Sequence, residues 1–201
     1  ALTANTTASY NTAVGYKAGY STSTGQLNLS LGSFALHSNT TGSQSTAVGH
    51  TALYSATATG TPNNTAVGFK AAYYNTTGAA NTAIGANALI NNTTASRNTA
   101  VGFQSMYANT TGTENVAMGA YSLDANTTGT ALTAIGDAAM SANTTADNNT
   151  AIGSESLKVN TTGASNTAIG KKSLWSNTTG TRNTAVGMEA LKTITTGNYN
   201  T

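Results

Sequence analysis

The sequence predicts an all-β protein, a parallel β-solenoid (β-roll) of about eleven 17-residue coils. The first observation is a glycine that recurs every 17 residues from Gly15 to Gly187, with one step of 19 between Gly49 and Gly68. The second is the repeat consensus Asn-Thr-Ala-(Val/Ile)-Gly-x-x-(Ala/Ser)-Leu-x-x-Asn-Thr-Thr-Gly-x-x, whose positions are numbered here 1 to 17. The third is that the segments between glycines are too short for helices and rich in β-branched residues, which favour strands.

The period runs through the whole chain, so residues 1–201 are predicted to form a single repeat domain with no internal boundary. One irregular coil, with a two-residue insertion near 55–63, contains the only proline, Pro62. One coil alone buries too little to fold, and stacking supplies a continuous core. Because Ala1-Leu2 match positions 8 and 9 and Asn200-Thr201 match positions 1 and 2, we expect coils to continue into more of the same chain or another subunit.

Composition argues against several classes of protein. Only 7% of residues are charged, the net charge is +2 and there is no cysteine, so neither a disulfide framework nor a thiolate metal site is expected. No basic run exists that would follow a nucleic-acid backbone. No apolar run approaches the ~20 residues of a membrane helix. We therefore expect no nucleic-acid partner and no membrane span in this chain.

Substitutions within the repeat predict which side chains face the core. Position 4 is always aliphatic, and position 2 is usually Thr but becomes Leu29 and Val116. Since alternate strand residues share a face, positions 2 and 4 are predicted to point inward, with the Leu or Met of position 9 as the second large core residue. The glycine of position 15 is expected to relieve a turn that needs positive φ.

Position 3 lies on the opposite face of the predicted strand, yet it is always small. An exposed strand position would accept Lys, Glu or Gln, so something must pack closely against it. Two interpretations are open: a tight internal gap, or a neighbouring chain. The candidate inter-chain packing residues are Ala13, Ala47, Ala66, Ala83, Ala100, Ala117, Ala134, Ala151, Ala168 and Ala185.

Asparagines recur at positions 1 and 12, at the same height in successive coils. Stacked parallel strands lie ~4.8 Å apart, so identical amides are predicted to form hydrogen-bonded ladders. The Asn-Thr-Thr turns are also glycosylation sequons, although the periodic turn explains them without any sugar. The candidate acceptors are Asn39, Asn109, Asn126, Asn160 and Asn177.

Position 10 is rich in aromatic side chains, which a solenoid would align along one side. This stripe is either a packing ladder over the thin core or a surface that stacks on sugars or a neighbouring fibre. Its members are Tyr20, Tyr54, Tyr73, Tyr107 and Trp175. Elsewhere His37 and His50 lie at different positions of adjacent coils, and the six acidic residues never cluster in sequence. The chain is therefore predicted not to be an enzyme and to need no metal or other cofactor.

The segment Asn115-Val116-Ala117-Met118-Gly119 and the Asn-Thr-Ala-Ile-Gly cores resemble the head repeats of trimeric autotransporter adhesins. They are also similar to repeats of phage tail-fibre-like and bacterial surface fibre proteins. The resemblance spans the whole chain. It implies a left-handed parallel β-roll and a trimer whose chains pack through small residues.

The main functional hypothesis is a non-enzymatic structural protein of an extracellular fibre, filament or appendage, on the cell surface or on a virion, with copies of itself as partners. The first alternative is an adhesin head that binds a host-surface glycan or receptor. The second alternative is an ice-binding protein, because regular outward threonines on a flat solenoid suit that role. The threonines considered for it, such as Thr110 and Thr111, are adjacent within a turn.

Overall fold

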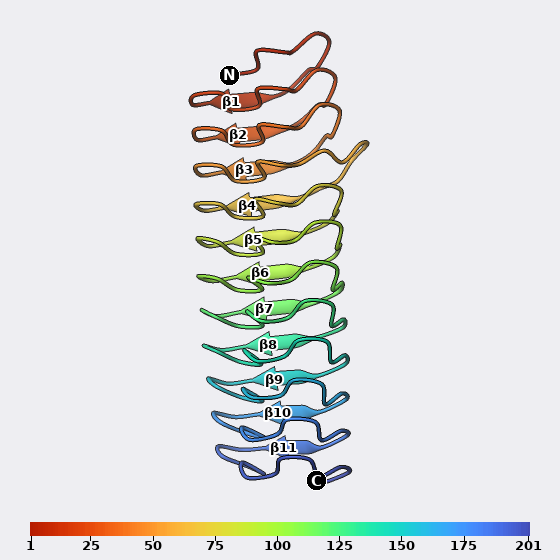
Figure 1. Cartoon of the computed structure of the whole chain (residues 1–201). Coiled ribbons are helices and arrows are strands. Elements are labelled where there is room, and N and C mark those ends of the chain that lie inside the picture. The colour runs from red at the N-terminus through yellow and green to blue at the C-terminus, as the bar shows by residue number, and fades with distance from the viewer.

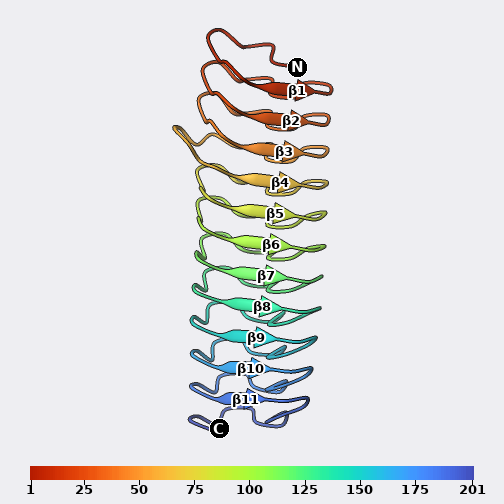
Figure 2. The ribbon, with the colours of Figure 1, turned by 180° about the vertical axis from the view of Figure 1, so that it is seen from behind.

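The computed structural model describes all 201 residues as one stack of coils, with the N-terminus at one end and the C-terminus at the other (Figure 1). Each coil contributes one three-residue strand, and all strands lie on the same side of the stack, as the view from behind in Figure 2 also shows. The strands are β1 (Thr12–Val14), β2 (Leu29–Leu31), β3 (Thr46–Val48), β4 (Thr65–Val67), β5 (Thr82–Ile84), β6 (Thr99–Val101), β7 (Val116–Met118), β8 (Thr133–Ile135), β9 (Thr150–Ile152), β10 (Thr167–Ile169) and β11 (Thr184–Val186).

The strands form one parallel, 11-stranded sheet in sequence order, which confirms the predicted β-solenoid. Each repeat position pairs with the same position of the next coil, as in Val116↔Thr133, so identical side chains stand in columns. The rest of each coil is also bonded to its neighbour. For example, the Leu89 amide donates to the Ser105 carbonyl at 2.9 Å. The hydrogen bonds that hold the rod together therefore run along its axis.

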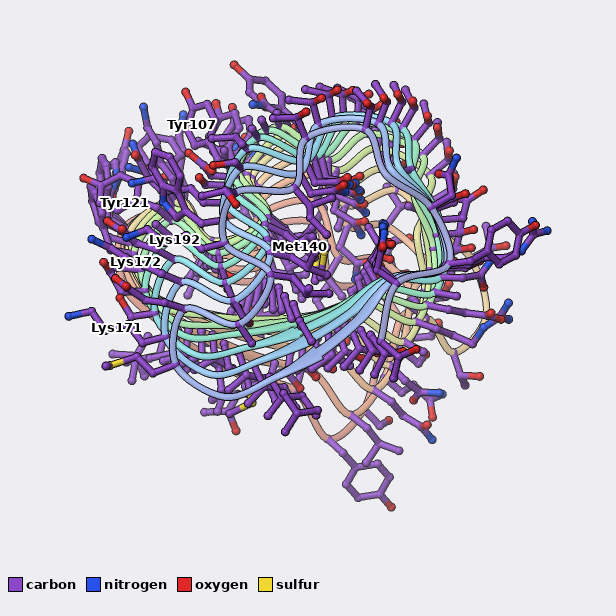
Figure 3. All side chains as sticks on the ribbon, turned by 90° about the horizontal axis from the view of Figure 1, so that it is seen from below. Tyr107, Tyr121, Met140, Lys171, Lys172 and Lys192 are labelled. Atoms are coloured by element: carbon purple, nitrogen blue, oxygen red, sulfur yellow. The ribbon has the colours of Figure 1, made fainter.

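The core lies inside the coils and is built from positions 3, 8 and 9. Leu and Met at position 9 are almost completely buried, as predicted, and Figure 3 shows Met140 pointing into the interior. The alanines of position 3 and the alanines and serines of position 8 pack around them. The core is therefore thin: most coils contribute one large side chain and two small ones, while Gly19 and Ala72 stand at position 9 of the first and fourth coils.

The predicted direction of the strand side chains is wrong. In strands β2 to β10 the middle residue is buried, while the residues on either side of it are half-buried or exposed. Positions 2 and 4 thus point to solvent, and position 3 points inward. The aliphatic column at position 4 suggested the reverse, but the coil is too flat to accommodate Val or Ile opposite the position 9 leucines.

The two glycine columns have different physical causes. The glycine at position 5 has φ between 124° and 136°, and a Cβ on Gly119 would collide with the backbone of Gly136 in the next coil. The glycine at position 15 has no positive φ, contrary to our expectation. Position 15 favours a small residue because the backbone of the next coil and an asparagine side chain lie close to it, as they do at Gly129.

Three other positions of most coils adopt the left-handed conformation although they are rarely glycine. They are positions 7, 9 and 17, represented by Glu155 (φ 58°), Leu157 (φ 50°) and Ser165 (φ 61°). This conformation costs an L-residue roughly 1–2 kcal/mol. The tight corners, and the inward direction of the position 9 side chain, require it.

The two-residue insertion forms a loop that projects beyond the other turns (Figure 1). No strand is lost, because Thr46 of β3 still pairs with Thr65 of β4. The insertion is therefore a local excursion of one turn. Gly60 at its tip has φ 71°, and a Cβ added there would have no neighbouring atom within 4 Å, so the tip is open to solvent.

Candidate functional site

The alanine column at position 3 belongs to the chain's own core. Ala47, Ala66, Ala100, Ala117, Ala134, Ala151 and Ala168 have no exposed surface, Ala83 and Ala185 have 1–2%, and Ala13 in the first strand is half-buried. These side chains pack against positions 8 and 9 of the same chain. The prediction that they form an inter-chain surface is corrected: the internal interpretation holds, and a Glu substitution there would test folding, not assembly.

The solvent side of the sheet carries two columns that sequence reasoning assigned to the interior. We call the side chains at positions 2 and 4 the outer face. Position 2 is Thr in all strands but β2 and β7, and position 4 is Val, Ile, Leu or Met throughout. Between the two end strands, five of the position 4 side chains are 37–43% exposed and the other four are half-buried; the exposed ones are Leu31, Ile84, Met118, Ile152 and Ile169. No residue of the outer face is charged.

A ladder of seven buried asparagines at position 12 runs from Asn75 to Asn177, as predicted. The side-chain amide of each donates to the Oδ1 of the previous one; the distance is 2.6 Å from Asn92 to Asn75 and 3.1 Å from Asn109 to Asn92. The ladder ends at Asn177, whose Oδ1 has no partner because Ile194 follows in the next coil. It is also interrupted in the irregular coil, where Ala56 stands at position 12.

The asparagines at position 1 form a different kind of ladder. The Oδ1 of Asn98 accepts from the backbone amide of Asn115 at 3.0 Å, and the Asn98 side-chain amide donates to the Gly112 carbonyl at 2.8 Å. The same carbonyl also accepts from Asn109 at 3.0 Å. In the coils that carry both asparagines, the two columns therefore converge on the carbonyl of position 15 and satisfy that buried acceptor.

The five candidate glycosylation sites lie in position 12. Their exposed fraction is 2% at Asn39 and 0% at Asn109, Asn126, Asn160 and Asn177. The amide nitrogen that would carry a sugar donates to a position 15 carbonyl in each case. The folded chain therefore offers none of these nitrogens to a glycosyltransferase, and the turn accounts for the sequons.

The aromatic stripe at position 10 is a stacked ladder in the first coils only. Tyr20, His37, Tyr54 and Tyr73 stack face to face, with centroids 5.2, 4.9 and 5.0 Å apart and planes within 9° of parallel. These rings cover one another, so their faces are not free to stack on a sugar. The other two predicted members lie apart from the ladder, Tyr107 exposed and Trp175 half-buried.

Most aromatic and charged side chains gather on one edge of the rod, formed by positions 6, 7 and 10, which we call the variable edge. Figure 3 shows five of them there: Tyr107, Tyr121, Lys171, Lys172 and Lys192. Along this edge the composition changes. Coils near the N-terminus carry aromatic rings, and coils near the C-terminus carry ion pairs such as Lys158–Glu155 at 3.0 Å and Lys192–Glu189 at 2.8 Å. The residues of this edge therefore differ from coil to coil far more than those of positions 1 to 5.

The ion pairs shift the titration of the acids on this edge. A hydrogen bond from Lys158 lowers the pKa of Glu155, and Lys192 does the same to the pKa of Glu189. Asp124 is the exception: burial raises its pKa. Its Oδ1 is buried without a hydrogen-bond partner, so the charged form is poorly solvated.

The surface has a single concavity, about 270 Å³, beside the irregular loop. No ionisable side chain lines it; its residues are Thr57, Ala58, Thr59, Thr61, Pro62, Thr77 and Ala79. No three His, Cys, Asp or Glu side chains come together in a way that would hold a metal ion. No helix in the structure is long and apolar enough to span a membrane.

Comparison with protein-family models, with curated proteins and with solved structures found no match for this chain. The resemblance to adhesin head repeats, with the handedness and trimer that it implies, therefore stays a prediction from the repeat itself.

Proposed function

We propose that the chain is a non-enzymatic structural repeat protein of an extracellular fibre or surface appendage, and that copies of it pack side by side through the outer face. The observation that carries the proposal is the column of exposed and half-buried aliphatic side chains that runs the length of the sheet. Contiguous apolar surface of this extent on a soluble protein usually marks an interface.

A second copy of the chain suits the outer face better than an unrelated partner. The outer face carries no charged side chain that would select a different protein by charge complementarity. Its side chains repeat from strand to strand with the same spacing, so they can pack against the outer face of a second copy in register. Eleven strands at ~4.8 Å make a strip about 50 Å long, and a width of five residues from position 1 to position 5, at ~3.3 Å per residue, gives about 800 Å². That footprint is comparable to the ~800 Å² that one partner contributes to a stable interface.

The test introduces charge on the outer face. We expect the double variant Val101→Lys/Ile135→Lys to be monomeric, since assembly would bury two unpaired ammonium groups, while the wild type forms a homo-oligomer or fibre. Size-exclusion chromatography with light scattering and negative-stain electron microscopy report the state of assembly, and far-UV circular dichroism checks the fold.

The matched control, Thr94→Lys/Thr128→Lys, adds the same charge at exposed turn residues of position 14. It should assemble like the wild type. A wild-type chain that remains monomeric at all concentrations, or an outer-face variant that assembles normally, would contradict the proposal.

One observation favours ice binding as a second candidate function. The threonines of position 2, unlike those of the turns, form a regular outward array with the aliphatic residues of position 4. The spacing is ~4.8 Å between strands and about 6.7 Å along each strand, which gives a flat lattice of methyl and hydroxyl groups. Thermal hysteresis of the monomeric chain measures this activity directly, and its absence rejects the candidate.

A further inference from the structure

We infer that the variable edge of the first four coils binds an acidic polysaccharide that lies along the rod axis between Lys17 and Lys70. The inference concerns other columns than the outer face, so it does not depend on self-association. Both lysines occupy position 7, three coils apart, which corresponds to about 14 Å at ~4.8 Å per coil.

Each lysine is part of the same local arrangement. The Lys17 ammonium lies 5.4 Å from the ring centre of Tyr16 and 5.3 Å from that of Tyr20. The Lys70 ammonium lies 5.3 Å from the ring centre of Phe69 and 5.8 Å from that of Tyr73. In both coils, therefore, an ammonium group stands beside an outer ring at position 6 and an inner ring at position 10.

The rings between the two lysines are continuous. Behind them stands the inner ladder from Tyr20 to Tyr73, whose faces are covered. In front of it, Tyr16 meets Phe34 edge to face at 5.2 Å, and His50 stacks on Phe69 at 5.7 Å. Tyr16 is 64% exposed and Phe69 48%; because His50 covers one face of Phe69, Tyr16 and the uncovered part of Phe69 are available to the C–H face of a sugar. Sequence reasoning selected the inner column and missed the outer one, whose members occupy position 6 in three coils and position 7 in the coil of Phe34.

The charge of this region selects an anionic partner. Lys17, Lys70 and Arg97 are the only charged side chains before Glu114. Neither Lys17 nor Lys70 forms an ion pair, whereas Lys158, Lys172 and Lys192 at the other end of the same edge each contact a glutamate. Two unpaired cations on an aromatic surface, without a nearby acid, complement a chain of sugars that carries widely spaced carboxylates.

A nucleic acid is also an anion that the two lysines would attract, but it fits the geometry of this edge less well. Single-stranded binding sites combine a continuous basic groove with ring faces on which bases stack. Here the cations are only two and lie about 14 Å apart, and the inner rings are already stacked on one another. A polysaccharide with low charge density needs neither a basic groove nor inserted bases.

The experiment measures binding of hyaluronate oligosaccharides, neutral malto-oligosaccharides and oligothymidylate to the full chain by isothermal titration calorimetry. We expect hyaluronate to bind, malto-oligosaccharides to bind at least fivefold more weakly, and added salt to weaken the hyaluronate complex. In Lys17→Ala/Lys70→Ala the hyaluronate Kd should rise about 4- to 25-fold, because each exposed ammonium–carboxylate contact contributes about 2- to 5-fold.

Two matched controls complete the design. Lys171→Ala/Lys172→Ala removes two charges from positions 6 and 7 of a distant coil, and Phe103→Ala/Tyr121→Ala removes a distant pair of rings. Neither control should change hyaluronate binding. Tyr16→Ala/Phe69→Ala, which removes two rings of the proposed site, should weaken it. Light scattering of the same samples reports assembly, so failure of one proposal is distinguishable from failure of the other. No hyaluronate binding, equal loss in the distant lysine variant, or tighter binding of oligothymidylate would overturn the inference.

Discussion

The asparagine ladder allows a quantitative test, because Asn91 and Asn92 are neighbours with different environments. Asn92 is fully buried; its amide donates to Asn75 Oδ1 at 2.6 Å and to the Ala95 carbonyl at 3.0 Å, and its Oδ1 accepts from Asn109 at 3.1 Å. Replacing it by Ala removes three buried hydrogen bonds. At about 1 kcal/mol each, the expected loss in the free energy of unfolding is about 3 kcal/mol.

The loss stays near this figure because two of the three partners keep another close hydrogen bond, and Asn75 Oδ1 keeps a 3.5 Å contact with the Asn81 amide. The Ala95 carbonyl still accepts from Asn81 at 2.8 Å, and Asn109 still donates to Gly112 at 3.0 Å. Asn91, in contrast, makes one exposed bond to the Tyr107 carbonyl at 2.9 Å. Its replacement by Ala should cost at most about 1 kcal/mol.

The assay is urea denaturation followed by far-UV circular dichroism, in which Asn92→Ala should unfold at clearly lower urea than Asn91→Ala. Because cooperativity in a long repeat array can break down, amide hydrogen exchange in the coils on either side of Asn92 provides a second readout. Equal, small effects of the two substitutions would refute the view that the ladder holds the coils together.

Three further predictions concern backbone conformation and pH. Ala131 has a left-handed backbone (φ 54°), so Ala131→Gly should raise the free energy of unfolding by about 0.5–1 kcal/mol. Gly119→Ala places a Cβ against the Gly136 backbone and should prevent native stacking of the coils. Thermal denaturation of the two variants distinguishes these outcomes. Asp124→Asn should stabilise the chain at neutral pH, because burial raises the pKa of Asp124 in the folded state. The folded chain then binds more protons than the unfolded chain as pH rises above 3.8, so the wild type loses stability over that range and the variant does not. Denaturation of both proteins at several pH values checks this, and a constant difference between them would contradict it.

The irregular coil shows how far the repeat pattern predicts local structure. The step of 19 residues located the insertion, and the structure confirms that pairing resumes at Thr65. The sequence also shows that both ladder positions of this coil depart from consensus, with Ser45 and Ala56 in place of asparagine. Only the three-dimensional structure reveals that the two asparagine columns share one acceptor, the carbonyl of position 15. The sequence alone therefore could not predict that replacing both asparagines removes both side-chain donors to that carbonyl.

The period alone determined the fold class, the register and the buried leucines of position 9, because a fixed spacing stacks identical residues and only a stack gives so short a repeat a core. It did not determine the outer face. Alternation along a three-residue strand says that positions 2 and 4 share a side, but not which side, and hydrophobicity favoured the wrong one. The tertiary structure decided it: the interior between sheet and opposite wall accommodates only Ala beside Leu, so Val and Ile are left on the surface. That inversion moves the candidate interface from the alanines to the exposed aliphatic column.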